Sequence, residues 1–116
     1  MNSNYRSGYT FELRIAGILQ TNGYYVIRAA GSHGIADLVA MKTGETVFVQ
    51  CKAGQSKIPL PEWNRLYAVA SMLGAIPVLV TRDRLGRVTW TELTGTAAPR
   101  ETRPGKQWHP DMVGAL

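Results

Sequence analysis

Asp37 and Lys52 are charged residues set into apolar stretches that have the composition of β-strands. Asp37 lies inside the run 35–40, and Lys52 ends the run 46–52, two positions after Gln50. Burying a carboxylate is costly unless it is paired or binds a metal, so Asp37 requires a partner. An acid on one strand, with a polar residue and a lysine on the next, is a combination that can bind a divalent cation and hydrolyse a phosphodiester bond.

The alternation of side chains along a strand groups these residues further. Gln50 and Lys52 share one face of their strand, whereas Cys51 points to the other. If the two runs form a hairpin, Asp37 lies across from Gln50 and Lys52, about 5–8 Å away by cross-strand spacing. A helix at the N-terminus can bring Glu12 in from the side. The expected cluster is therefore Glu12, Asp37, Gln50 and Lys52.

The oxygen atoms of this cluster suit a hard cation such as Mg²⁺, with Mn²⁺ as a substitute. The expected ligands are the carboxylates of Glu12 and Asp37, the amide oxygen of Gln50 and the backbone carbonyl of Cys51. A cation at this point binds a phosphate oxygen and acidifies a water molecule. Lys52 is expected to orient that water or to stabilise developing negative charge. With only two histidines in the chain, a zinc site built on His and Cys has no support.

Each member of the cluster also has an ordinary structural explanation. Asp37 and Lys52 can form a structural ion pair, which is the commoner role of any single Asp–Lys pair. Glu12 can be a solvated acid in the first turn of a helix, where the helix dipole favours it. Gln50 alone indicates nothing. The combination, in this order and on these elements, is more specific than its parts.

The glycine-containing loop 29–34 is a second candidate for chemistry. Its glycines let the backbone approach a phosphate, Ser32 offers a hydroxyl, and His33 can donate a proton near neutral pH, although a histidine in such a loop is more often a solvated turn residue. Further cations can contact DNA phosphates, with solvated surface charge as the default for each. They are Arg6, Arg14, Arg28 and Lys57, with Arg100, Arg103 and Lys106 near the C-terminus.

Hydrophobic periodicity predicts the elements that position these residues. We expect a helix over 9–22, strands at 24–28, 35–41 and 46–52, a second helix from Pro61 to Gly74, and strands at 76–81 and 87–93, the last an edge strand. The buried stripe of the second helix is expected to be Trp63, Leu66, Tyr67, Ala70 and Leu73. This αβββαββ order predicts an α/β fold, a central mixed sheet flanked by helices, over residues 1–94. Residues 95–116 lack a periodic core pattern and are expected to be a tail that is extended or ordered only by a partner.

Composition sets the broad class. The chain has 116 residues and a net charge of +5, which favours a polyanionic partner such as nucleic acid. The single Cys51 rules out an internal disulfide and is expected to be a buried structural thiol in a reducing compartment. Neither an apolar run long enough for a membrane helix nor a signal-peptide pattern is present, so an intracellular, cytoplasmic protein without a membrane partner is expected.

Between Arg6 and Leu93 the sequence resembles the archaeal-type Holliday-junction resolvases, a branch of the PD-(D/E)xK nuclease superfamily. The resemblance is carried by five motifs: Gly8-x-x-Phe11-Glu12, Gly23-Tyr24-x-Val26-x-Arg28-x-Ala30-Gly31-Ser32, Ala36-Asp37-Leu38-Val39-Ala40, Gln50-Cys51-Lys52 and Gly74-Ala75-Ile76-Pro77-Val78. Together these motifs are fairly specific, whereas Asp37 and Lys52 alone are not.

The resemblance implies a restriction-endonuclease-like fold and a symmetric homodimer that cuts opposed strands of four-way DNA junctions with Mg²⁺. Glu12 and Asp37 match the metal-binding acids of the family, Lys52 its catalytic lysine and Ser32 a serine of its active-site loop. Arg28 falls on a basic position of the pattern. The apolar dimer interface is expected from Trp63, Leu66, Tyr67, Leu73 or the last strand, residues that core packing explains equally well. A viral or prophage origin would fit a compact enzyme of this class.

Gln50 departs from the pattern of the superfamily, which has Glu or Asp at this position in most members. The substitution removes one negative charge from the cation site but keeps an oxygen ligand of similar reach. Two other interpretations therefore stay open beside an active resolvase. One is a catalytically silent junction-binding module with a nuclease fold, and the other is a related restriction or repair nuclease that acts on other branched or duplex DNA.

Overall fold

The computed structural model describes residues 3–29, 34–53 and 58–111, with side chains from Gly8 onward. Its elements follow the order α1 (Ser3–Thr21), β1 (Tyr25–Arg28), β2 (Leu38–Lys42), β3 (Glu45–Ala53), α2 (Leu60–Met72), β4 (Ile76–Arg82), β5 (Val88–Leu93) and β6 (Gly105–Gln107). The expected αβββαββ order is confirmed, with one further strand at its end. Neither helix is both long and apolar enough to cross a membrane.

The strands form a single six-stranded sheet in the order β1-β2-β3-β4-β5-β6. All neighbours are antiparallel except β3 and β4, which run parallel because α2 carries the chain back over the sheet between them. The tight turn between β2 and β3 contains Gly44 at a φ of 77°, a left-handed conformation that glycine adopts without strain. This turn fixes the register in which Leu38 lies opposite Val49.

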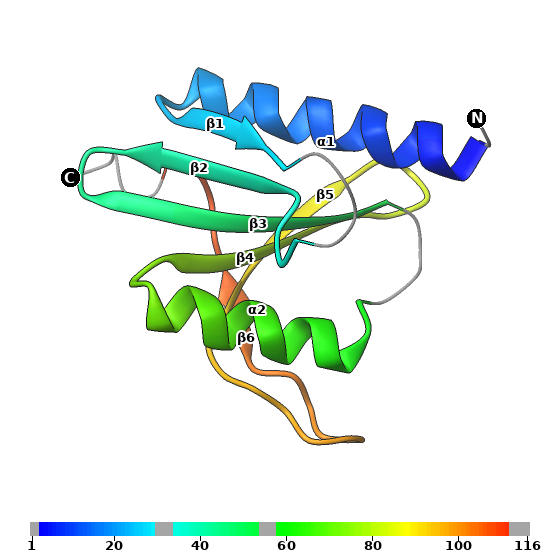
Figure 1. The fold of residues 1–116 in the computed structure, drawn as a ribbon. Coiled ribbons are helices and arrows are strands. Elements are labelled where there is room, and N and C mark those ends of the chain that lie inside the picture. The colour runs from blue at the N-terminus through cyan, green and yellow to red at the C-terminus, as the bar shows by residue number, and fades with distance from the viewer. Residues whose placement is uncertain (1–2, 30–33, 54–57, 112–116) are drawn as a thin grey trace.

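The two helices cover opposite faces of the sheet (Figure 1). On one face, Phe11, Ile15 and Leu19 of α1 are almost fully buried against side chains of β2, β3 and β4. The other face is covered by α2, whose Trp63 and Leu66 are buried in a second, smaller cluster. The i, i+4, i+8 spacing of the α1 residues places them on one helical face, as the sequence predicts.

Most element boundaries differ from those expected by only one or two residues, and four differences are of more consequence. The first helix begins at Ser3 instead of residue 9, and β2 begins at Leu38, so that Asp37 precedes the strand. Leu73 is 62% exposed, because α2 ends one residue before it. Finally, β5 is not the edge of the sheet, since β6 pairs with it antiparallel.

The tail is the largest correction. Residues 95–111 pack on the same chain, so the prediction that they are extended or ordered only by a partner is wrong for this stretch. Trp108 is 3% exposed, and the centre of its ring lies 5.6 Å from that of Trp90. The backbone N–H of Trp108 donates to the backbone carbonyl of Trp90. On the other face of the sheet, the Asn64 amide donates to the Ala97 carbonyl and accepts from the Ala97 N–H, each over 2.9 Å. These single contacts have no periodicity that sequence patterns could reveal.

If Trp108 is part of the core, Trp108→Ala should lower the free energy of unfolding by about 3–5 kcal/mol, the usual cost of truncating a buried aromatic residue. Urea denaturation measures this change. His109→Ala, at the neighbouring exposed position, is the matched control and should change stability little. A Trp108→Ala protein as stable as the parent would mean that the tail does not contribute to the folded monomer.

Candidate active site

Asp37 is held at the end of β3 by backbone hydrogen bonds. Its own N–H donates to the Val49 carbonyl over 2.8 Å, which continues the β2–β3 ladder by one residue. Its carboxylate Oδ2 accepts the N–H of Cys51, also over 2.8 Å. These two hydrogen bonds hold the Asp37 side chain beside the segment of β3 that contains Gln50 and Lys52, as the sequence predicts.

Glu12 approaches this point from α1. It follows Phe11, whose buried ring fixes the rotation of the helix, and its side chain is 16% exposed. Arg28 at the end of β1 donates to Glu12 Oε2 from Nε over 3.2 Å, and its Nη2 lies 3.1 Å from the same oxygen. The Arg28 guanidinium also covers the ring of Tyr9. Arg28 thus belongs to the site as a partner of Glu12.

A cavity of about 480 Å³ joins these residues. It lies where α1, the start of β2, the end of β3 and the start of α2 meet. Glu12, Asp37, Gln50, Cys51 and Lys52 all line it, so the cluster expected from the sequence is brought together. The remaining lining residues are Gly8, Phe11, Gly34, Ile35, Ala53, Glu62 and Arg65.

Glu12 and Asp37, two of the acids that line the cavity, disfavour each other's ionisation. Burial raises the pKa of Asp37, and the hydrogen bond from Cys51 offsets only part of this effect. Burial also raises the pKa of Glu12, and the nearby charge of Asp37 raises it further, against the opposing effect of Arg28. Two half-buried carboxyl groups that disfavour joint ionisation are stabilised as a charged pair when a cation binds between them.

Cys51 contributes its backbone, not its thiol. Burial raises the pKa of the Cys51 thiol well above its ordinary value, and the charges of Asp37 and Glu12 add to this. The thiol therefore stays neutral and is unsuited to nucleophilic attack. This agrees with the expected structural role.

The oxygen atoms that line the cavity suit a hard divalent cation that is bound by both charged and neutral ligands. Two carboxylates, the Gln50 amide oxygen and the Cys51 carbonyl are the oxygen ligands that such a cation prefers. Among the residues that the structure describes, no three His, Cys, Asp or Glu side chains lie close enough to hold a metal ion together. Gln50 lines the same cavity and offers a neutral amide oxygen instead of a carboxylate.

Two residues of α2 in the cavity were missed by sequence reasoning. Glu62 lies 3.6 Å from the Lys52 ammonium, and Arg65 is one helical turn further along. The sequence holds a signal for this position, because only a short stretch of chain separates the end of β3 from α2, so that the first turn of the helix must lie near Lys52.

Of the other predicted residues, one lies outside the cavity and the side chains of four are not described. Arg14 is exposed on α1 and donates to the Gly86 carbonyl in the β4–β5 turn, outside the cavity. Ser32, His33 and Lys57 fall outside the described residues, and Arg6 lies in α1 within the part whose side chains are not described. Their expected roles stay predictions.

The raised carboxyl pKa values predict the pH dependence of stability in metal-free protein. In the window between the unfolded and folded pKa of Asp37 the folded state binds more protons, so stability falls as pH rises through it. Asp37→Asn should therefore raise the thermal midpoint at neutral pH, with the gain vanishing below about pH 4.

Asp83 is the control, because its pKa is shifted in the opposite direction from that of Asp37. Hydrogen bonds from Arg87 lower the pKa of Asp83, so its charge stabilises the folded state above the unfolded pKa and this is lost as pH falls. Asp83→Asn should lower the thermal midpoint at neutral pH. Equal shifts of the two variants would contradict the proposed strain at Asp37.

Comparison with known proteins supports the interpretation of this site. The sequence matches the family model of the archaeal Holliday junction resolvase (Hjc) over residues 3–96. The crossover junction endodeoxyribonuclease Hjc of Methanocaldococcus jannaschii is 32% identical over 85 residues, or 71% of this chain. The chain spans 63% of the length of that relative.

Solved structures show the same fold. The Holliday junction resolvase Hjc of Archaeoglobus fulgidus superimposes with a TM-score of 0.58 at 22% identity, over 72% of this chain and 70% of that one. A bacterial homing endonuclease superimposes with a TM-score of 0.53 at 13% identity, over 89% of this chain and 85% of that one. The expected restriction-endonuclease-like architecture is confirmed. Since the family match includes every residue of the cavity, the chain belongs to the archaeal Holliday junction resolvase (Hjc) family.

Proposed function

We propose that this chain is a structure-selective endonuclease that resolves four-way DNA junctions by Mg²⁺-dependent hydrolysis of phosphodiester bonds. The observation that carries the proposal is the convergence of Glu12, Asp37, Gln50 and Lys52 in one cavity of a family member. The relative from M. jannaschii bears the name of a crossover junction endodeoxyribonuclease. The net charge of +5 suits a DNA substrate.

The residues of the cavity divide the work of hydrolysis. Asp37 and Glu12, with the Gln50 amide oxygen and the Cys51 carbonyl, would hold the cation, and Mn²⁺ is the expected substitute. When bound, the cation would withdraw charge from the phosphate and lower the pKa of an attacking water. Lys52 then orients that water or stabilises the charge that develops on the phosphate. Its pairing with Glu62 is long, at 3.6 Å, and half-exposed, so the ammonium can turn to the substrate at small cost.

Cations around the cavity are positioned for the DNA backbone. Arg65 lines the cavity itself, and Arg28 lies at its edge. Contacts of Arg6, Arg14, Ser32, His33 and Lys57 with DNA, expected from the sequence, are part of the same proposal. Because such contacts go to phosphates, they set affinity and its salt dependence without reading sequence.

Cleavage assays with junction, flap and duplex DNA side by side test the proposal. In Mg²⁺ we expect paired nicks in the junction and little cutting of linear duplex. Asp37→Ala and Lys52→Ala should each lower the rate by at least about a hundredfold, the usual cost of losing a group that stabilises transition-state charge, while junction binding persists. Asp111→Ala, which removes an exposed acid far along the chain, is the matched control. Equal cutting of duplex and junction would instead indicate a general or repair-type nuclease.

We further propose that the protein acts as a homodimer, since a two-fold protein matches a two-fold junction. Of the interface residues expected from the sequence, Trp63 and Leu66 are buried in the core and cannot contact a partner. A better candidate is the sheet face opposite α1 at β1 and β2. There Tyr25 and Ile27 are 70% and 48% exposed.

Partly exposed apolar residues extend this face. Val39 lies opposite Ile27, and Met41 lies opposite Tyr25, in the antiparallel register of β1 and β2. The second helix packs on β3 and β4 instead, and so leaves these residues uncovered. A continuous apolar face of this kind on a small protein is typical of an association surface.

Ile27→Arg should convert the dimer to a monomer, because it places a charge in the centre of this face. Sedimentation equilibrium measures the mass, and the cleavage assay should then show single nicks in place of paired ones. Leu85→Arg, at an exposed apolar position in the β4–β5 turn, is the control and should remain dimeric. A dimer that survives Ile27→Arg would place the interface elsewhere.

Gln50 supports one alternative, a catalytically silent junction-binding module. A site with two carboxylates binds a hard cation less strongly than a site with three. Under the silent alternative, the chain binds junctions without cutting them in Mg²⁺ or Mn²⁺, and Gln50→Glu restores cutting. Under the main proposal, the parent chain already cuts.

A further inference from the structure

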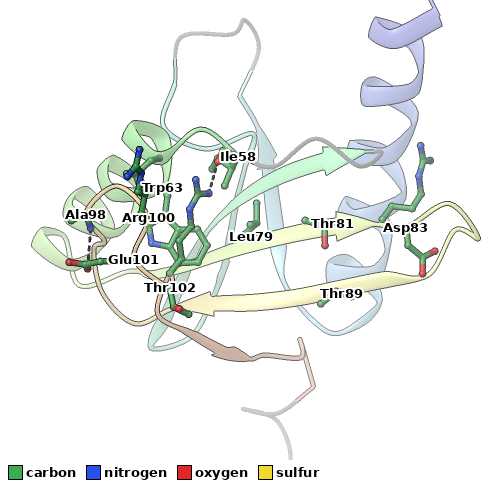
Figure 2. A pocket seen from close by; sticks show the side chains of 13 residues that line it. Ile58, Trp63, Leu79, Thr81, Asp83, Thr89, Ala98, Arg100, Glu101 and Thr102 are labelled. Atoms are coloured by element: carbon green, nitrogen blue, oxygen red, sulfur yellow. Dashed lines mark hydrogen bonds between the residues drawn. The ribbon is translucent and has the colours of Figure 1, made fainter.

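A second, larger cavity of about 810 Å³ lies on the sheet face that α2 covers. Its floor is formed by β4 and β5, and its walls by the start of α2 and by the loop that contains Arg100 (Figure 2). Figure 2 shows Leu79 and Thr81 along β4, and Thr89 on the neighbouring strand β5, between this loop and Asp83. The loop segment 98–103 lies beyond residue 96, where the family match ends.

This cavity adjoins the candidate active site. In the parallel register of β3 and β4, Gln50 lies beside Leu79, and Lys52 lies beside Thr81. Parallel partners point to the same face of a sheet, and adjacent strands are about 4.8 Å apart. The linings of the two cavities are therefore neighbours in the sheet, since Gln50 and Lys52 line one and Leu79 and Thr81 line the other.

The lining combines an apolar floor with hydrogen-bonding groups. Ile58, Trp63 and Leu79 are almost fully buried and supply apolar surface, while Thr81 and Thr89 supply hydroxyls at the open end. The Arg103 guanidinium lies 5.7 Å from the Trp63 ring centre, and it donates to the Ile58 carbonyl. A guanidinium fixed in this way presents a flat surface on which a nucleobase can stack.

The rim of the cavity carries more cations than acids. Arg82, Arg100 and Arg103 line it together with Asp83 and Glu101, and Asp83 pairs with Arg87 over 2.7 Å. Arg100 is exposed and makes no ion pair or side-chain hydrogen bond with the residues that the structure describes. Its φ of 70° is a left-handed conformation that residues other than glycine rarely adopt.

We propose that this cavity receives one unstacked nucleotide of the DNA strand that leads to the active site. The base would lie on the apolar floor against Arg103, and Arg100 would contact its phosphate. The proposal rests on the proposed nuclease function for its choice of DNA. An apolar concave floor favours a base over a row of phosphates, and an intact duplex is too wide to enter. Enzymes that act on nucleic acids often take up bases in such pockets at the cost of unstacking.

The first test measures binding of a short fluorescent oligothymidylate to the full chain by anisotropy, in EDTA so that nothing is cut. The parent protein should bind it, and Arg100→Gly should weaken binding about tenfold, within the range for loss of one base or phosphate contact. Because glycine accepts the positive φ, this variant should keep the thermal midpoint of the parent. Arg84→Gly removes the same charge from the β4–β5 turn and should bind almost as the parent does.

Filling the cavity is an independent test of base insertion. Thr89→Trp adds a ring above the floor, whereas Thr43→Trp adds the same ring in the β2–β3 turn at the far end of the sheet. A four-way junction that carries 2-aminopurine at the branch point should brighten on binding the parent and Thr43→Trp, because the base unstacks, and should stay dim with Thr89→Trp. Unchanged fluorescence with the parent, or equal oligothymidylate binding by Arg100→Gly, would overturn the proposal.

These results separate the two proposals. Junction cleavage without brightening would leave the nuclease function intact and remove the base-binding cavity. Oligothymidylate binding that depends on Arg100, without any cleavage, would keep the cavity and remove the nuclease function. If duplex DNA bound as tightly as the single-stranded oligothymidylate in the anisotropy assay, the rim would be assigned to phosphate contacts with a duplex arm. That result would contradict base insertion.

Discussion

The hydrogen bond from the Cys51 N–H to the Asp37 carboxylate determines the geometry of the whole site. It joins the residue before β2 to the end of β3, and so holds an acid in a cavity that residues of both helices line. The bond does not remove the cost of burial, since the pKa of Asp37 is still raised. Glu12, brought in by the buried ring of Phe11, adds a second carboxyl group and a repulsion between charges. The core of the fold therefore supplies the free energy that holds two acids together.

Sequence patterns predicted the features that follow the regular periodicity of a helix or a strand. The spacing of Phe11, Ile15 and Leu19 gave the buried face of α1, and the alternation along 46–52 placed Gln50 and Lys52 on one face of β3. The hairpin at Gly44 then fixed the position of Asp37. Each of these predictions depends on a period of 2 or 3.6 residues, which burial against a sheet imposes on the sequence.

Features that depend on single contacts were not predictable in this way. Trp108 is buried by an aromatic contact with Trp90 after a stretch without any pattern, and the three-residue β6 is too short to show alternation. The same holds for the position of Glu62 beside Lys52 and for the pairing of Arg28 with Glu12, which depend on how elements meet. The second cavity exists only because the chain beyond residue 96 folds back over β4 and β5.

The central claim is that the half-buried pair of Glu12 and Asp37 binds a divalent cation. The most direct measurement is a calorimetric titration of the metal-free protein with Mn²⁺, in the absence of DNA, for the parent and for Asp37→Asn. We predict saturable binding at one class of site in the parent and loss of that binding in Asp37→Asn. Equal binding by both proteins, or no binding by the parent, would mean that the two carboxyl groups form a structural cluster and not a metal site.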